Sequence, residues 1–113
     1  MIVYHVTHPS AADAIDTEGF RDGSGTYMTS TQLSGVFVSD VPLVIESGLE
    51  DPVVFAIDLA EIHLVGCGLL EEGKNYREWI VPAARINAAG RRRVEWPECL
   101  DDIEALRARN RAL

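Results

Sequence analysis

Short runs of apolar residues, bounded by glycine, proline and small polar residues, recur along most of the chain. Runs of this length that are rich in β-branched and aromatic side chains predict strands rather than helices. The six segments that fit are residues 2–6, 35–39, 53–59, 63–65 (the weakest), 76–81 and 91–96. Because most of them follow one another without a long helix between them, the order favours an α+β fold over repeated βαβ units.

Apolar residues at helical spacing follow the first predicted strand. This helix is expected to open at Pro9 and Ser10, with Asp13 three residues after Ser10 as in a capping box. It should end at Gly19, because glycine adopts the left-handed backbone conformation at low cost.

A second helix is predicted near the middle of the chain. It should make two turns between residues 42 and 47, with Asp40 as its N-cap and Gly48 at its end. Residues 21–34, which lie between the two predicted helices, are rich in Gly, Ser and Thr. This composition predicts a long loop.

The C-terminal segment, residues 97–113, is predicted to be a helix that begins at Pro97. Its acidic residues come first and its arginines last, an order that complements the helix dipole. Leu100, Ile103 and Leu106 give it a thin apolar stripe, so one face should pack. Residues 1–113 are then expected to form a single domain, with this helix as its tail.

The 113 residues carry a formal net charge of −8 at pH 7. Affinity for nucleic acid comes largely from neutralising phosphates, so this charge argues against a nucleic-acid-binding protein. The local exception is the basic run Arg91, Arg92, Arg93. Such a run is more often a solvated strand edge than a contact for a polyanion.

Membrane, secretory and metal-binding classes find little support in the sequence. No apolar stretch approaches the roughly 20 residues that a membrane span needs, and the N-terminus lacks the features of a secretory signal. We therefore expect a cytoplasmic protein. Cys67 and Cys99 form no CxxC pair, and His5, His8 and His63 form no ligand pattern, so no metal site is expected.

Three segments, in this order, resemble the catalytic domain of poly(ADP-ribose) polymerases and related ADP-ribosyltransferases. Residues 4–7 (Tyr-His-Val-Thr), with the helix that follows them, are similar to the family's His-Gly-Ser/Thr strand and helix. Residues 35–40 (Gly-Val-Phe-Val-Ser-Asp) are similar to its Gly-Ile-Tyr-Phe-Ala-Asp strand, and residues 76–82 (Tyr-Arg-Glu-Trp-Ile-Val-Pro) to its Tyr-Asn-Glu-Tyr-Ile-Val strand. The resemblance covers most of residues 2–87. It implies an α+β fold of two small packed antiparallel sheets with N-terminal helices and a C-terminal helix.

The resemblance also implies that NAD is the co-substrate and that five residues contact it. His5 matches a histidine that hydrogen-bonds the adenosine ribose, and Val6 matches a glycine whose backbone holds the nicotinamide carboxamide. Thr7 keeps the hydroxyl of that motif. Phe37 matches a tyrosine that stacks on nicotinamide, and Ser39 lies in the same strand motif. From the residues alone, His5 also fits a hydrogen-bonded core histidine, Thr7 a helix N-cap and Phe37 a core side chain.

Glu78 matches the family's catalytic glutamate. Breaking the nicotinamide–ribose bond builds positive charge on ribose C1′, as in glycoside hydrolysis. A carboxylate bonded to the 2′-hydroxyl would stabilise that cation most as it develops, which lowers the barrier. Without the resemblance, the pattern is explained more simply by a Glu78 that faces solvent or pairs with Arg77.

The implied activity is transfer of a single ADP-ribose from NAD to an unidentified acceptor, or hydrolysis of NAD, as in a small bacterial toxin. In a toxin pair, a cognate inhibitor protein would cover the NAD cleft. Val6 and Phe37 leave room for a second interpretation, an inactive module that binds NAD or ADP-ribose. A third is an RNA 2′-phosphotransferase, which has a related fold and also consumes NAD but needs a basic groove. An unrelated α+β domain is the remaining interpretation.

Overall fold

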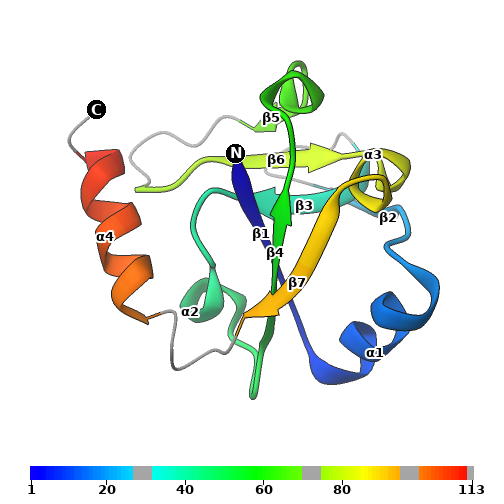
Figure 1. Ribbon diagram of the computed structural model, residues 1–113, viewed down its shortest axis with the longest axis horizontal. Coiled ribbons are helices and arrows are strands. Elements are labelled where there is room, and N and C mark those ends of the chain that lie inside the picture. The colour runs from blue at the N-terminus through cyan, green and yellow to red at the C-terminus, as the bar shows by residue number, and fades with distance from the viewer. Residues whose placement is uncertain (27–31, 70–74, 95–99, 112–113) are drawn as a thin grey trace.

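The computed structural model describes residues 1–26, 32–69, 75–94 and 100–111 and shows an α+β fold (Figure 1). The strands in these ranges are β1 (Ile2–Thr7), β2 (Gly23–Thr26), β3 (Gln32–Ser39), β4 (Val53–Asp58), β5 (Gly68–Leu69), β6 (Glu78–Val81) and β7 (Gly90–Val94). The helices are α1 (Pro9–Glu18), α2 (Val44–Ser47), α3 (Ala83–Asn87) and α4 (Leu100–Arg111), with a 3₁₀ turn η1 (Glu61–Leu64).

Six of the described strands form one antiparallel sheet in the order β5-β6-β3-β1-β4-β7, and β2 pairs with the first half of β3. β1 and β4 pair along the whole length of β1, whereas β1 and β3 share the single register pair Tyr4–Ser39 within the described strands. The β3-β6-β5 half therefore crosses the β1-β4-β7 half instead of running alongside it (Figure 1). The structure thus has one continuous sheet, joined at the β1–β3 contact, in place of the two separate sheets that the resemblance implies.

Both faces of the sheet are covered, because residues on the central strands alternate between two hydrophobic clusters. The first cluster includes Val3, Val38, Phe55 and Ile57 of the sheet, Ala12 and Ile15 of α1, and Ala83 and Ile86 of α3. The second includes Tyr4, Val6 and Val54 of the sheet, Val44 of α2, and Ile103 and Leu106 of α4. Figure 1 accordingly shows α1 and α3 on one side of the molecule and α2 and α4 on the other.

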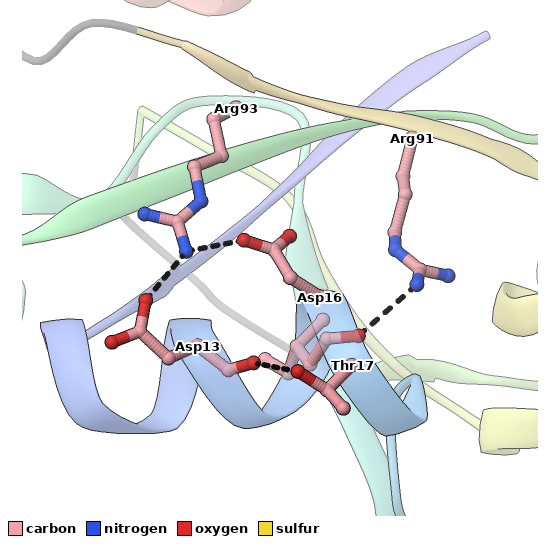
Figure 2. A network of polar contacts seen from close by, with 6 residues as sticks. Asp13, Asp16, Thr17, Arg91 and Arg93 are labelled. Atoms are coloured by element: carbon pink, nitrogen blue, oxygen red, sulfur yellow. Dashed lines mark hydrogen bonds and ion pairs between the residues drawn. The ribbon is translucent and has the colours of Figure 1, made fainter.

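The edge strand β7 holds α1 in place through two arginines (Figure 2). The Arg93 guanidinium pairs with Asp16 and, at 3.1 Å, with Asp13, both on α1. Arg91 donates at 3.0 Å to a backbone carbonyl of the same helix. Arg91 and Arg93 of the basic run therefore bind α1, which differs from the predicted solvated strand edge. Arg92 fits that prediction, since it is exposed and has no partner among the described residues.

The N-terminus of α1 differs from the predicted capping box. The helix begins at Pro9, so the N-cap is His8, and no side chain caps it within the described residues. Ser10 therefore lies inside the first turn, where its hydroxyl contacts the His8 imidazole at 2.9 Å. At the other end the helix stops at Gly19 as predicted, and the Gly19 amide donates to the Ile15 carbonyl; its φ of +84° is positive, but its ψ of 179° lies outside the left-handed helical region that was expected.

Several short elements differ from the sequence-based expectation. Residues 63–65 belong to the η1 turn and its end rather than to a strand, because the Ile62 and Val65 side chains face solvent and supply no sheet face. The expected loop at 21–34 contains β2 and the start of β3, while residues 27–31 lie outside the described parts. α2 begins at Val44 and makes a single turn. α3 and β5 were not predicted from the sequence.

Gly35, in the middle of β3, provides a direct test of this packing. Its φ of +146° is rarely adopted by other residues, and an added Cβ would lie 2.8 Å from Ile80 Cγ1 and 3.0 Å from the Val81 carbonyl oxygen. We expect Gly35→Ala to lower the free energy of unfolding by about 1–3 kcal/mol, measured in urea. Gly90→Ala, where a Cβ meets open space, is the control and should change it by less than about 0.5 kcal/mol. Equal values for the two variants would contradict the described β3–β6 packing.

Candidate functional site

A cavity of about 310 Å³ opens on the face of the sheet that α2 and α4 cover. Its volume is within the usual range for small-molecule sites, roughly 300–1,000 Å³. Five of the six residues predicted as site residues line it, namely His5, Val6, Phe37, Ser39 and Glu78. They come from β1, β3 and β6, so the strand order brings together segments that are far apart in the sequence.

Strand register sets the positions of the polar side chains in this cavity. Ser39 is paired with Tyr4 on one side and with Glu78 on the other, so the three side chains form a row on one face of the sheet. Ser39 is buried, and its hydroxyl accepts a hydrogen bond from the Val41 amide at 3.2 Å. Glu78 is only partly buried. A ligand in the cavity therefore has access to the Glu78 carboxylate.

His5 lies at the point where β1 and β3 diverge. Its Nδ1 is 2.8 Å from the Phe37 carbonyl oxygen, and its ring meets the Phe20 ring edge-on. A carbonyl only accepts, so Nδ1 carries the proton and Nε2 of the neutral ring is an acceptor. Burial lowers the pKa of His5 from its ordinary value, and the bond to Phe37 offsets this only in part. His5 is therefore neutral at pH 7, held in one tautomer.

This shift predicts how stability depends on pH. Because the folded-state pKa of His5 lies below the unfolded value of 6.5, the unfolded chain binds the proton more readily. The contribution of neutral His5 to the free energy of unfolding is therefore fully present above pH 6.5, and it is lost as the pH falls from 6.5 toward the folded-state pKa. Urea unfolding of wild type and His5→Asn at pH 5, 6, 7 and 8 checks this, because asparagine can still donate to Phe37 but does not titrate. The stability difference between the two proteins should shrink on acidification; a difference independent of pH would contradict the assignment.

A second cavity, of about 320 Å³, adjoins the first on the α1 side of the sheet. It is lined by His5, Thr7 and Phe37 together with apolar residues of α1 and the Phe20 ring. His5 and Phe37 line both cavities. Thr7 lies only in the second, so the structure separates it from Glu78, and it does not cap α1, whose N-cap is His8.

A buried carboxylate next to the cavity was not predicted. Asp40 is 1% exposed, and its two oxygens accept from the Arg77 amide at 2.7 Å and from Arg77 Nε at 3.0 Å. The Asp40 amide in turn donates to the Arg77 carbonyl at 3.1 Å. The prediction that Asp40 caps α2 is therefore wrong, because Asp40 binds Arg77 and the N-cap of α2 is Leu43. The clamp fixes the backbone of β6 one residue before Glu78.

The other residues that line the first cavity are Tyr4, Val38, Leu43, Glu46, Ser47 and Tyr76. Tyr4, Phe37 and Tyr76 contribute rings, and Glu46 adds a second carboxylate to that of Glu78. Aromatic faces and carboxylates together favour a flat, positively charged group. Tyr76 and Glu46 were not predicted as site residues, because only the folded chain brings α2 and the segment before β6 to one wall.

Within the described parts of the chain, His, Cys, Asp and Glu nowhere gather in a group of three that could hold a metal ion. None of the helices in those parts is long and apolar enough to cross a membrane. Neither a family model, nor a curated protein, nor a solved structure matches the chain.

Proposed function

We propose that this chain is an ADP-ribosyltransferase-like enzyme that binds NAD in the first cavity and cleaves its nicotinamide–ribose bond. The observation that carries the proposal is the convergence of His5, Phe37 and Glu78, from three strands, on one cavity of ligand size. These are three of the residues that the resemblance to ADP-ribosyltransferases assigns to NAD.

The chemistry of the lining supports NAD independently of that resemblance. The nicotinamide ring of NAD is a planar cation, which suits a cavity lined by aromatic rings and by the Glu78 carboxylate; Glu46, the other carboxylate of the lining, is paired with Arg107. As the bond to ribose breaks, its electron pair leaves with nicotinamide, and the positive charge moves to C1′ and the ring oxygen of ribose. The Glu78 carboxylate would stabilise this developing charge more than the ground state, so the rate increases.

The pair of adjoining cavities suits a two-part ligand. In this account the nicotinamide riboside half lies in the cavity with Glu78, and the adenosine half lies against α1 in the apolar second cavity. His5 lies where the two meet, and its Nε2 would accept a hydrogen bond from a ribose hydroxyl. The two cavities share His5 and Phe37 in their linings, so a ligand that occupies both would pass beside these two side chains.

The reaction ends when a nucleophile adds at C1′. A hydroxyl oxygen forms the new bond and loses its proton, so water yields free ADP-ribose and a hydroxyl-bearing acceptor yields a single ADP-ribose adduct. The RNA 2′-phosphotransferase alternative needs a basic groove, and Arg91 and Arg93, which are engaged with α1, are poor candidates for one.

Nicotinamide release from NAD, followed by chromatography, together with NAD binding followed by calorimetry, tests the proposal. Release and binding by the wild-type chain are the expected results. Binding without release would replace the enzyme with an NAD-binding module. If saturating concentrations of NAD gave neither release nor binding, the resemblance would be no guide to function.

A further inference from the structure

We propose that α4 supports the wall of the NAD cavity from behind and that Arg107 on this helix positions two residues of that wall, Glu46 and Tyr76, for the nicotinamide ring. The inference rests on the proposed function and extends it to a helix outside the three segments that resemble ADP-ribosyltransferases.

The apolar face of α4 supports the residues that form the cavity. Ile103 is buried, and Leu106 is partly buried in the same cluster. That cluster also contains four residues that line the cavity, namely Tyr4, Val6, Leu43 and Tyr76. Removing support from one side of this cluster would therefore alter the shape of the cavity directly.

Arg107 connects α4 to two other segments of the chain, α2 and the residues just before β6. Its guanidinium pairs with Glu46 of α2 and donates to the Asn75 side chain, and its Cζ lies 5.9 Å from the centre of the Tyr76 ring. The Arg107 side chain is only 15% exposed. A planar guanidinium can make all three contacts at once, whereas an ammonium is a point charge with no flat face.

The segment before β6 is held a second time from the same helix. Asn110, three residues after Arg107, donates at 3.1 Å to the Asn75 carbonyl. Two residues of α4 thus fix Asn75, and through it Tyr76. Glu78 is held separately by the Asp40–Arg77 clamp. Arg107 should therefore set how well the cavity wall fits the substrate, while the position of the catalytic carboxylate depends on other contacts.

This division predicts that binding and catalysis respond differently to Arg107. We expect Arg107→Met and Arg107→Lys to raise KM for NAD roughly tenfold, because the wall loses its ion pair and its stacked cation. The kcat of nicotinamide release should stay within about twofold of wild type, since Glu78 keeps its place. Arg109→Met, an exposed position on the same helix, is the matched control and should leave both constants unchanged.

Steady-state nicotinamide release by the full-length variants, with thermal unfolding measured in parallel, gives the outcome. An unchanged KM in both Arg107 variants overturns the proposal, because α4 would then not affect NAD binding. A normal KM in Arg107→Lys alone also overturns it, because only the positive charge of Arg107, and not its planar shape, would then matter. A fall in kcat with no rise in KM overturns it as well. If neither variant folds, Asn75→Ala removes the other side-chain acceptor of Arg107 without changing a residue that lines the cavity; a raised KM supports the proposal and an unchanged one overturns it. A wild-type chain that neither binds nor cleaves NAD would instead refute the proposed function itself.

Discussion

Replacing Glu78 with glutamine should reduce the rate of nicotinamide release from NAD by about 10²–10³-fold, with little change in NAD affinity. Glutamine keeps the size of the side chain and a carbonyl oxygen that accepts hydrogen bonds, but it has no negative charge to stabilise the positive ribose. The lost interaction belongs mainly to the transition state, so kcat should fall and the dissociation constant should not.

The measurement compares single-turnover nicotinamide release with calorimetric NAD affinity for the wild type and the variant. Glu61→Gln is the matched control, because Glu61 is exposed on η1 and does not line the cavity. It should behave as wild type in both assays. Release by Glu78→Gln at the wild-type rate would remove Glu78 from the mechanism, even if NAD binds in the cavity.

Asp40→Ala should cause the largest loss of stability among the polar substitutions considered, about 2–3 kcal/mol in urea unfolding. The substitution removes both acceptors of Arg77 and leaves its amide, on the segment entering β6, without the carboxylate that now binds it. Asp40 is 1% exposed, so replacing it also leaves a gap in the packing. The activity of whatever fraction remains folded should fall too, because Glu78 follows Arg77 directly.

Asp40→Asn separates the charge of this clamp from its hydrogen bonds. The amide oxygen still accepts from the Arg77 backbone, and only the charged bond to Arg77 Nε is weakened, so the loss should be smaller, about 1 kcal/mol. An Asp40→Ala protein as stable as wild type would mean that the clamp contributes little to holding β6 in place.

The strands that carry the candidate site could be predicted because their signals are local. Residues 2–6, 35–39 and 76–81 each contain a run of β-branched and aromatic residues, and they correspond to β1, β3 and β6, although β3 begins three residues earlier and β6 two residues later than expected. The end of α1 at Gly19 and of α2 at Gly48 follows from the backbone freedom of glycine. These features depend on a few neighbouring residues, so the chain reveals them without its fold.

The contacts that organise the site could not be predicted, because they join distant positions. Asp40 and Arg77 are 37 residues apart, and Glu46 and Arg107 are 61 apart. Asp40 after a strand has the local pattern of a helix N-cap, but in the fold its buried carboxylate binds Arg77 on the neighbouring segment instead. Likewise, β2 forms in a glycine- and serine-rich segment because β3 lies beside it, which composition alone does not indicate.

The central claim is that the cavity between β1, β3 and β6 is an NAD site, and an NMR titration tests it most directly. NAD would be added to the ¹⁵N-labelled Glu78→Gln protein, in which turnover should be slow. The account predicts saturable shifts of backbone amides that cluster at His5, Phe37, Ser39 and residue 78. Shifts confined to other parts of the chain, or no shifts at millimolar NAD, would contradict it.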